Sequence, residues 1–237
     1  MELLLPVALA ASISRTRSLV LPAACGGLMF ASVIASASRA GAAIVCAEAL
    51  IFLVAASVTR RNYRAAGIIA ASLICSTLAG GWSYVLERFS SSDLFEYRRE
   101  MLTATIAMIR ARPLTGFGLG AWPSVYPAFA VFDPPGVFMN HAHNDWAEWT
   151  ADGGLPFLGL LAIFGCAVAL RARQNLWTLG VPAVFAHALL DFPLHKSAIA
   201  CVLFFLAGVS LSRRRNIIDP VLRNSHEITP AKSLLQV

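Results

Sequence analysis

The sequence predicts an all-α protein, a polytopic bundle of transmembrane helices with one long polar loop. Hydrophobic residues make up 57% of its 237 residues and charged residues only 14%, whereas a soluble domain carries roughly 25% charged residues. The mean hydropathy of +0.67 points the same way. Basic residues cluster between the apolar runs, as is typical of membrane topology signals. The net charge of +6 therefore does not indicate a nucleic-acid partner, and we expect none.

The apolar runs predict about six to seven spans in two groups. A span needs ~20 apolar residues, and the run over residues 2–13 is shorter than that. The clearer runs cover residues 18–38, 40–59, 65–84, 153–170, 176–190 and 197–212. We therefore place spans 1–4 within residues 1–84 and spans 5–7 within residues 153–212. Residues 213–237 show no helical period and are expected to form a disordered cytoplasmic tail.

The distribution of basic residues predicts which side of the membrane the long loop, residues 85–152, faces. With this loop outside, the short outer connections hold only Arg39 and Lys196. The inner connections then hold Arg15, Arg17, Arg60, Arg61, Arg64, Arg171, Arg173, Arg213, Arg214 and Arg215. An excess of basic residues marks the cytoplasmic side, so the loop is expected on the external face. This orientation also places Met1 outside, and we expect the chain to be the C-terminal part of a longer protein.

The long loop contains a predicted amphipathic helix over residues 94–110. Its apolar residues, among them Met101 and Met108, recur at helical spacing, which suits a helix that lies on the bilayer or caps the bundle. Pro113 is expected to end it. The glycine-rich run over residues 116–120 is expected to be a turn, because it lacks the strand and βαβ unit that surround a dinucleotide site.

His141 and His143 are the loop residues best suited to acid–base chemistry, because an imidazole titrates near neutral pH and can act as a general base. Two other interpretations stay open. The imidazoles cap the next helix or sit in the headgroup layer, or they join carboxylates in a metal site. Zinc needs three or four ligands, and Asp145, Glu148 and Asp152 are nearby, but no recognised spacing supports such a site. We therefore expect neither a metal nor a cofactor.

Two arginines on the external face are candidates for binding an anion. Arg39 stands at the end of the span over residues 18–38, where its side chain either snorkels to the interface or binds a group such as a phosphate. Arg98, on the predicted loop helix, has the same two interpretations. Its competitors are Arg99, Arg110 and Arg112, and spacing alone does not rank them.

A third polar feature on this face contains His187 and Asp191, which are one helical turn apart near the end of the sixth predicted span. Ionisable groups at membrane depth are functional candidates. A hydrogen bond to a neighbouring helix would equally explain His187.

Four short motifs on the predicted external face follow one another along the chain. They are Ser38-Arg39-Ala40-Gly41; Arg98 with Pro113-Leu114-Thr115-Gly116-Phe117-Gly118-Leu119-Gly120; His141-Ala142-His143-Asn144-Asp145 with Asp152-Gly153-Gly154-Leu155-Pro156; and His187 with Asp191-Phe192-Pro193-Leu194. In combination they resemble the O-antigen ligase and O-antigen polymerase-like family of membrane proteins. Phe157 and Leu102 depart from the residues usual in that family, whose members are typically longer.

This resemblance implies a membrane glycosyltransferase of the bacterial inner membrane with its loop in the periplasm. Such enzymes transfer a glycan from an undecaprenyl diphosphate carrier to a hydroxyl of lipid A-core, in ligases, or of another glycan repeat, in polymerases. Arg39 and Arg98 would neutralise the leaving diphosphate without a metal. His143 would be the base, with His141 as second choice, and the loop helix would cover the donor among the membrane lipids. The expected substrate-binding residues are Arg99, Asn144, Asp145, Asp191 and His187.

Two other classes of protein fit parts of the sequence. A transporter without covalent chemistry would place polar residues near the bilayer midplane, whereas the polar residues here gather mostly at one face. The second alternative is a truncated, inactive copy that serves only as a partner. The sequence does not distinguish a ligase from a polymerase.

Overall fold

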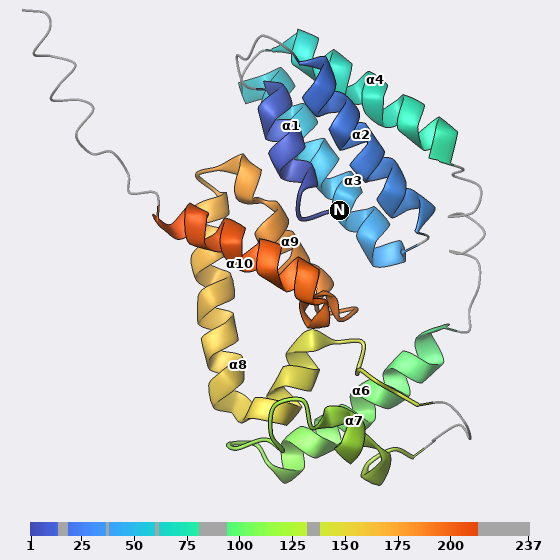
Figure 1. Ribbon diagram of the computed structural model, residues 1–237, viewed down its shortest axis with the longest axis vertical. Coiled ribbons are helices and arrows are strands. Elements are labelled where there is room, and N and C mark those ends of the chain that lie inside the picture. The colour runs from blue at the N-terminus through green and yellow to red at the C-terminus, as the bar shows by residue number, and fades with distance from the viewer. Residues whose placement is uncertain (14–18, 37, 60–61, 81–93, 132–137, 213–237) are drawn as a thin grey trace, which may run out of the picture.

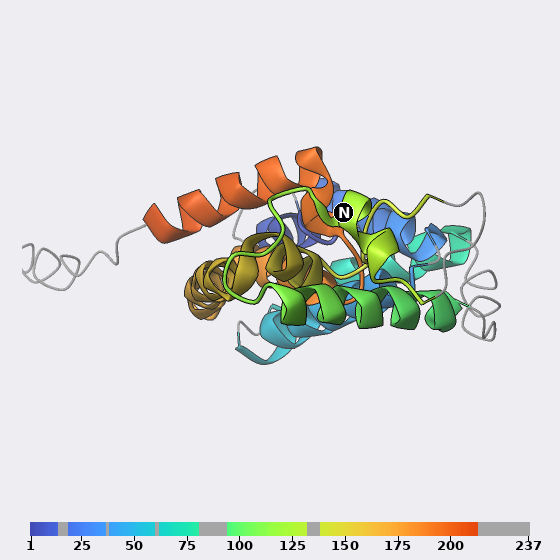
Figure 2. The ribbon, with the colours of Figure 1, turned by 90° about the horizontal axis from the view of Figure 1, so that it is seen from below.

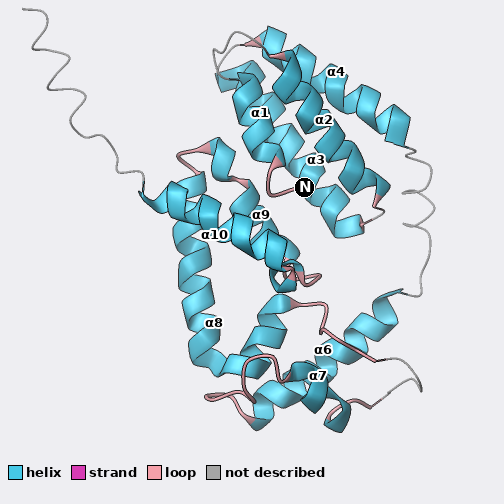
Figure 3. Ribbon diagram, in the orientation of Figure 1, coloured by secondary structure: helices cyan, strands magenta, loops and turns pink. Residues whose placement is uncertain are grey.

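All the regular secondary structure in the described part of the chain is helical (Figure 3). The computed structural model describes residues 1–13, 19–36, 38–59, 62–80, 94–131 and 138–212. The predicted all-α class is therefore confirmed. The predicted tail over residues 213–237 lies outside the described residues.

Four helices form an N-terminal bundle at one end of the molecule (Figure 1). They are α1 (Leu5–Ile13), α2 (Val20–Ala35), α3 (Arg39–Val54), which the π-helical segment η1 (Ala55–Thr59) extends, and α4 (Tyr63–Gly80). The completely buried members of their apolar core are Leu5, Ile34, Val45, Phe52, Ala56 and Ile69. Helices α2 and α4 approach closely because Gly27 has no side chain, and a Cβ there would lie 2.3 Å from Ser72 Oγ.

A second group of helices contains the long helix α8 (Asp145–Ala172), α9 (Gly180–His187) and α10 (Ser197–Ser212) (Figure 1). Short 3-10 helices, η3 (Leu176–Thr178) and η4 (Pro193–His195), connect them. Val168, Val181 and Leu203 are fully buried between these helices. Helix α8 bends at Gly154, whose φ of 75° lies in a region that favours glycine. Its first segment therefore turns away from the long apolar segment that follows.

The long loop folds around α6 (Leu94–Ala111), α7 (Trp122–Val125) and the 3-10 turn η2 (Tyr126–Ala128). The predicted helix over residues 94–110 is thus confirmed, and Figure 2 shows it lying across one end of the molecule. Met101 and Met108 pack against Trp122 and Tyr126, and the Trp122 indole donates a hydrogen bond of 2.9 Å to the Thr105 hydroxyl. Helix α6 buries this face in protein, which favours capping over lying free on the bilayer.

Two helices are long and apolar enough to cross a membrane by length and composition. They are Arg39–Val58, of 20 residues, and Asp145–Ala172, of 28 residues. The shorter apolar helices are Val20–Ala35, Tyr63–Leu78, Leu176–His187 and Ser197–Ser212. The count of six to seven spans and the domain boundaries therefore stay predictions. Large apolar side chains such as Leu28, Leu160 and Ile163 are exposed on these helices, as lipid-facing side chains would be.

Candidate functional site

The histidine segment, residues 141–143, lies where three elements meet: the start of α8, the connection between α9 and α10, and α6 (Figure 1). The Asp145 backbone N–H donates to the Ala188 carbonyl oxygen over 2.9 Å, which joins α8 to the end of α9. The Arg98 guanidinium donates to the Leu190 carbonyl oxygen over 3.2 Å, which joins α6 to the same connection. The structure thus brings together three of the four sequence motifs.

The outer pair, His143 and Asp191, faces the solvent side of this junction. His143 Nδ1 lies 3.1 Å from Asp191 Oδ1, and each side chain is 34% exposed. A carboxylate only accepts hydrogen bonds, so Nδ1–H is the donor and Nε2 of a neutral His143 is left as an acceptor. His143 has a φ of 52°, which is uncommon for a residue other than glycine and is often found at functional sites.

The environment of Asp191 favours its charged form. Partial burial opposes ionisation, but the hydrogen bonds from His143 and the Phe192 backbone N–H outweigh it, together with the positive charge of Arg98. The pKa of Asp191 is therefore lowered. The outer pair consequently carries a fixed negative charge that holds the His143 ring in one orientation.

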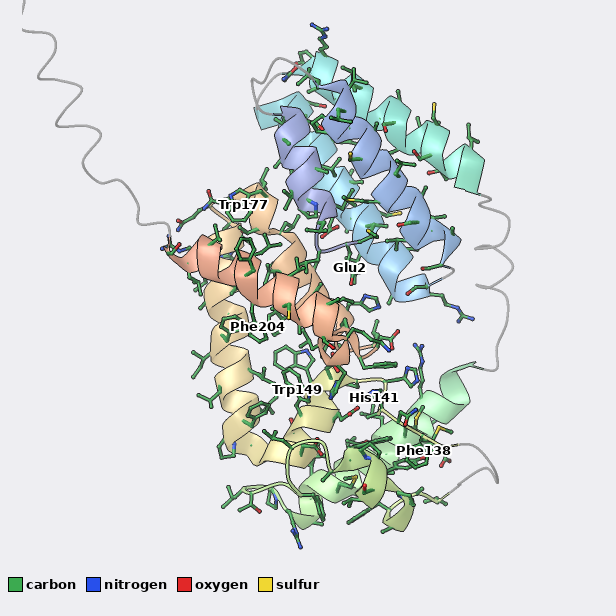
Figure 4. All side chains as sticks on the ribbon, viewed as in Figure 1. Glu2, Phe138, His141, Trp149, Trp177 and Phe204 are labelled. Carbon is green, nitrogen blue, oxygen red and sulfur yellow. The ribbon has the colours of Figure 1, made fainter. Side chains whose placement is uncertain are left out.

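The inner cluster consists of His141, Asp145, Glu148 and His195, and its two carboxylates come from the first turn of α8. Figure 4 shows His141 near the start of this helix. Glu148 Oε1 lies 3.0 Å from His141 Nδ1 and 3.2 Å from His195 Nε2. Asp145 Oδ1 lies 2.5 Å from His195 Nδ1. Asp145 and Glu148 are only 1% and 2% exposed. Two imidazoles and two carboxylates thus form one continuous chain of contacts.

Backbone N–H groups fix the two buried carboxylates. Leu194 N–H donates to Asp145 Oδ2 and Ala142 N–H donates to Glu148 Oε2, each over 2.7 Å. Burial opposes a charge on His195, but the hydrogen bond to Asp145 and the nearby carboxylates, Glu148 foremost, outweigh it, so the pKa of His195 is raised. The two carboxylates of the inner cluster are therefore buried and fixed, whereas the His141 ring is partly exposed.

The segment over residues 113–120, which contains the predicted glycine-rich turn at residues 116–120, is joined to the bend of α8 through a latch of backbone contacts. Its bonds run from Phe117 N–H to Ala151 O (3.0 Å), Gly118 N–H to Asp152 O (2.9 Å), Gly120 N–H to Asp152 Oδ2 (2.7 Å) and Leu155 N–H to Pro113 O (2.7 Å). A Cβ at Gly116 would lie 2.1 Å from the Asp152 carbonyl oxygen, and one at Gly154 would lie 2.4 Å from that of Leu114. The predicted turn is confirmed, and its glycines permit close contact between two backbones.

Asn144 caps α8 at its N-terminus. Its Oδ1 accepts a hydrogen bond of 3.0 Å from Ala147 N–H, as an N-cap residue does. Its Nδ2 donates to the Leu189 carbonyl oxygen over 2.9 Å. The two polar atoms of this side chain therefore join the start of α8, through Oδ1, to the end of α9, through Nδ2, and the Asp145 backbone N–H makes a second link to α9.

The remaining predicted residues lie around this junction or away from it. His187 Nδ1 lies 2.7 Å from Glu2 Oε1, and Figure 4 shows Glu2 near the start of the chain, beside the N-terminal bundle. His187 is therefore bound to the N-terminal segment, in line with its structural interpretation. Arg99 is exposed on α6.

Arg39 is the first residue of α3 and is partly exposed. The Ser38 hydroxyl caps this helix by accepting a hydrogen bond of 3.1 Å from Gly41 N–H. The Ser38-Arg39-Ala40-Gly41 motif thus fixes where α3 begins. This start of α3 lies at the end of the bundle that faces α6 (Figure 1).

Sequence reasoning did not select Glu148 and His195 as site residues. One signal for Glu148 was present: Asp145, Glu148 and Asp152 are spaced by three and four residues, which places them on one face of a helix. His195 gave no such signal, because it lies in η4 and its partners, Asp145 and Glu148, lie on α8.

Comparisons with known proteins assign a family. A family model described as O-antigen ligase matches residues 3–164, more than half of the chain. The match includes Arg39, Arg98, His141 and His143, and it ends before Asp191. No curated protein and no solved structure matches the chain. The predicted family is therefore confirmed: the chain belongs to the O-antigen ligase family, which implies a membrane protein with glycosyltransferase-like activity.

Proposed function

We propose that this protein transfers a glycan from an undecaprenyl diphosphate carrier to an acceptor hydroxyl at the periplasmic face of the bacterial inner membrane. The observation that carries the proposal is the convergence of Arg98, His143 and Asp191 from three elements. Arg98 donates to the carbonyl of Leu190, the residue before Asp191, and Asp191 holds His143. Transfer requires a cation beside the leaving diphosphate and a base beside the acceptor hydroxyl, and this arrangement supplies both at one place.

His143 serves as the general base. With Nδ1–H bound to Asp191, its Nε2 takes the proton of the acceptor hydroxyl as the hydroxyl oxygen attacks the anomeric carbon. The bond between that carbon and the diphosphate oxygen breaks in the same step, with inversion of configuration. His141 is the second choice for the base, since its Nδ1 also faces a carboxylate.

Arg98 and Arg39 stabilise the diphosphate as it leaves. Fixed cations aimed at developing negative charge lower the barrier without reorganisation, so the transfer step itself needs no metal ion. Arg99, exposed on the next position of α6, adds a contact to the donor. Asn144, Asp145 and Asp191 complete the substrate site, the first two chiefly by holding the histidine segment in place, whereas His187, bound to Glu2, supports the end of α9 from behind. Helix α6 covers the lipid-linked donor.

His143 is tested as the base by expressing the full open reading frame in a strain of its own host from which the chromosomal copy has been deleted. We expect His143→Ala to lower transfer from a labelled lipid-linked donor by about 10²–10⁴-fold, at an unchanged amount of folded protein in the membrane. Near-normal transfer would remove His143 as the base.

The test of the cation compares two arginines on α6. We expect Arg98→Ala to lower transfer about 10²–10³-fold, whereas Arg110→Ala, exposed in the last turn of the same helix, stays near wild type. Equal losses of transfer in the two variants would show that the total positive charge of α6 matters and the position of Arg98 does not.

The product profile distinguishes the two family activities. Loss of the high-mass ladder of lipopolysaccharide in the deletion strain, with glycan stranded on its carrier, identifies a ligase. Single repeats that stay attached identify a polymerase. A profile that is the same in the wild-type, deletion and His143→Ala strains would contradict glycan transfer and favour a transporter or an inactive copy.

A further inference from the structure

Three ligand atoms of the inner cluster, which a transfer step with His143 as the base does not use, converge from three separate segments. His141 Nδ1, Glu148 Oε1 and His195 Nε2 all lie within 4.8 Å of one another. The carboxylate oxygen is 3.0 Å from the first nitrogen and 3.2 Å from the second. Tetrahedral zinc with bonds of ~2.0–2.1 Å places its ligand atoms about 3.3 Å apart. We propose that His141, Glu148 and His195 bind a divalent metal ion of the zinc class.

The ligands are oriented by partners of their own. Asp145 Oδ1 accepts the hydrogen bond of His195 Nδ1–H, which leaves the Nε2 lone pair for an ion. Such a carboxylate behind a ligating histidine is a usual feature of metal sites. Ala142 N–H holds Glu148 Oε2, which directs Oε1 toward both imidazoles. The donor atoms are therefore fixed before any ion arrives.

The balance of charge also favours a cation. Asp145, Glu148 and Asp152 lie on one face of α8 and are 1%, 2% and 2% exposed. Asp152 Oδ1 is buried without a hydrogen-bond partner among the described residues. Buried carboxylates are costly unless they are paired or coordinate a metal. The imidazoles of His141 and His195 are the basic groups in contact with Asp145 and Glu148 in the described chain, and a divalent ion would balance the excess negative charge.

The donor set selects the class of ion. Two imidazole nitrogens and one carboxylate oxygen suit zinc and its transition-metal neighbours, whereas magnesium and calcium prefer oxygen ligands alone. Three protein ligands leave a fourth position for water. Binding requires a local adjustment of the two imidazoles, because the three donor atoms now lie within 4.8 Å of one another and the Trp149 indole N–H donates to His195 Nε2 over 2.9 Å. This bond must be released for Nε2 to ligate.

The ion would tie the histidine segment, α8 and η4 together beside the outer pair, without touching the diphosphate. Sequence spacing predicted no metal because the third ligand, His195, comes from beyond the next two predicted spans, 153–170 and 176–190. Metal binding can be measured without a substrate, so the failure of this proposal and the failure of glycan transfer are separate results.

The experiment uses the full chain in detergent, purified with a tag that contains no histidine and stripped with a chelator. Zinc retained after gel filtration is measured by mass spectrometry, and Co²⁺ serves as a spectroscopic probe of four-coordinate binding. We expect about one equivalent of zinc in the wild type. His141→Ala and His195→Ala should lose it, and Asp145→Asn should weaken binding about 10–100-fold. The matched control, His143→Ala, lies in the same segment and should keep the full equivalent.

Two results would overturn the proposal. One is the absence of stoichiometric zinc in the wild type, or its full retention in His141→Ala and His195→Ala. The other is a loss in His143→Ala as large as in His141→Ala, which would place the ion on the outer pair. If His195→Ala elutes as an aggregate, His141→Gln decides, because the His141 side chain is 28% exposed and its replacement leaves the buried carboxylates in place.

Discussion

His141 and His143 are two residues apart and each directs Nδ1 to a carboxylate, but their surroundings differ. The partner of His143, Asp191, is 34% exposed and lies near Arg98. The partner of His141, Glu148, is 2% exposed, and its Oε1 also contacts His195. The two imidazoles of the histidine segment therefore belong to two different sites. The two imidazoles are similarly exposed, at 28% and 34%, so it is the burial of the carboxylate partner that distinguishes the two sites.

The difference also sets the energetic role of each site. An exposed ion pair contributes little to stability because water screens it. A buried charge that loses its partner is strongly destabilising, because nothing replaces the lost contacts. The inner cluster should thus dominate stability and the outer pair should dominate transfer.

The sharpest test of this division compares two aspartates. We expect Asp145→Ala to lower the free energy of unfolding by about 3–5 kcal/mol, because the His195 imidazole and the Leu194 N–H lose a buried partner. Asp191→Ala should change it by less than about 1 kcal/mol. Unfolding in mixed detergent and dodecyl sulfate measures both variants. Equal effects would abolish the distinction between the two sites.

A smaller effect is expected where the latch holds the first segment of α8, which carries the inner cluster. Gly154→Ala should destabilise the protein by about 1–3 kcal/mol, because φ is positive there and a Cβ would meet the Leu114 carbonyl oxygen. Gly159→Ala is the matched control on the same helix, since nothing lies within 4 Å of a Cβ there. It should be neutral or stabilising by up to ~1 kcal/mol. A Gly154→Ala protein as stable as this control would show that the latch does not hold the cluster.

The smallest effect is a pH dependence of the outer pair. Because the pKa of Asp191 is lowered in the fold, its ionised form stabilises the protein above its unfolded pKa of about 3.9. This contribution is lost as the pH falls through the lowered folded value. The melting temperature of the wild type should therefore fall slightly more steeply than that of Asp191→Asn below about pH 4. Parallel curves would mean that the pair adds no stability.

The features that could be predicted from sequence depend on local pattern. The helical class, the helix before Pro113 and the glycine-rich turn follow from composition, period and turn residues. The partners of those features could not be predicted, because they form only when distant segments meet. The Glu148–His195 contact requires the α9–α10 connection to fold back onto α8. The partner of the glycine-rich turn, the bend of α8, likewise depends on tertiary packing.

The latch consists mainly of backbone bonds, so the side chains of the turn are not needed to hold it. Leu114 and Leu119 are 68% and 73% exposed. Substitutions at these two positions change what the turn presents outward while the join to α8 stays intact. The outward face of the turn can therefore vary in sequence without rebuilding the helix that carries the buried carboxylates Asp145 and Glu148.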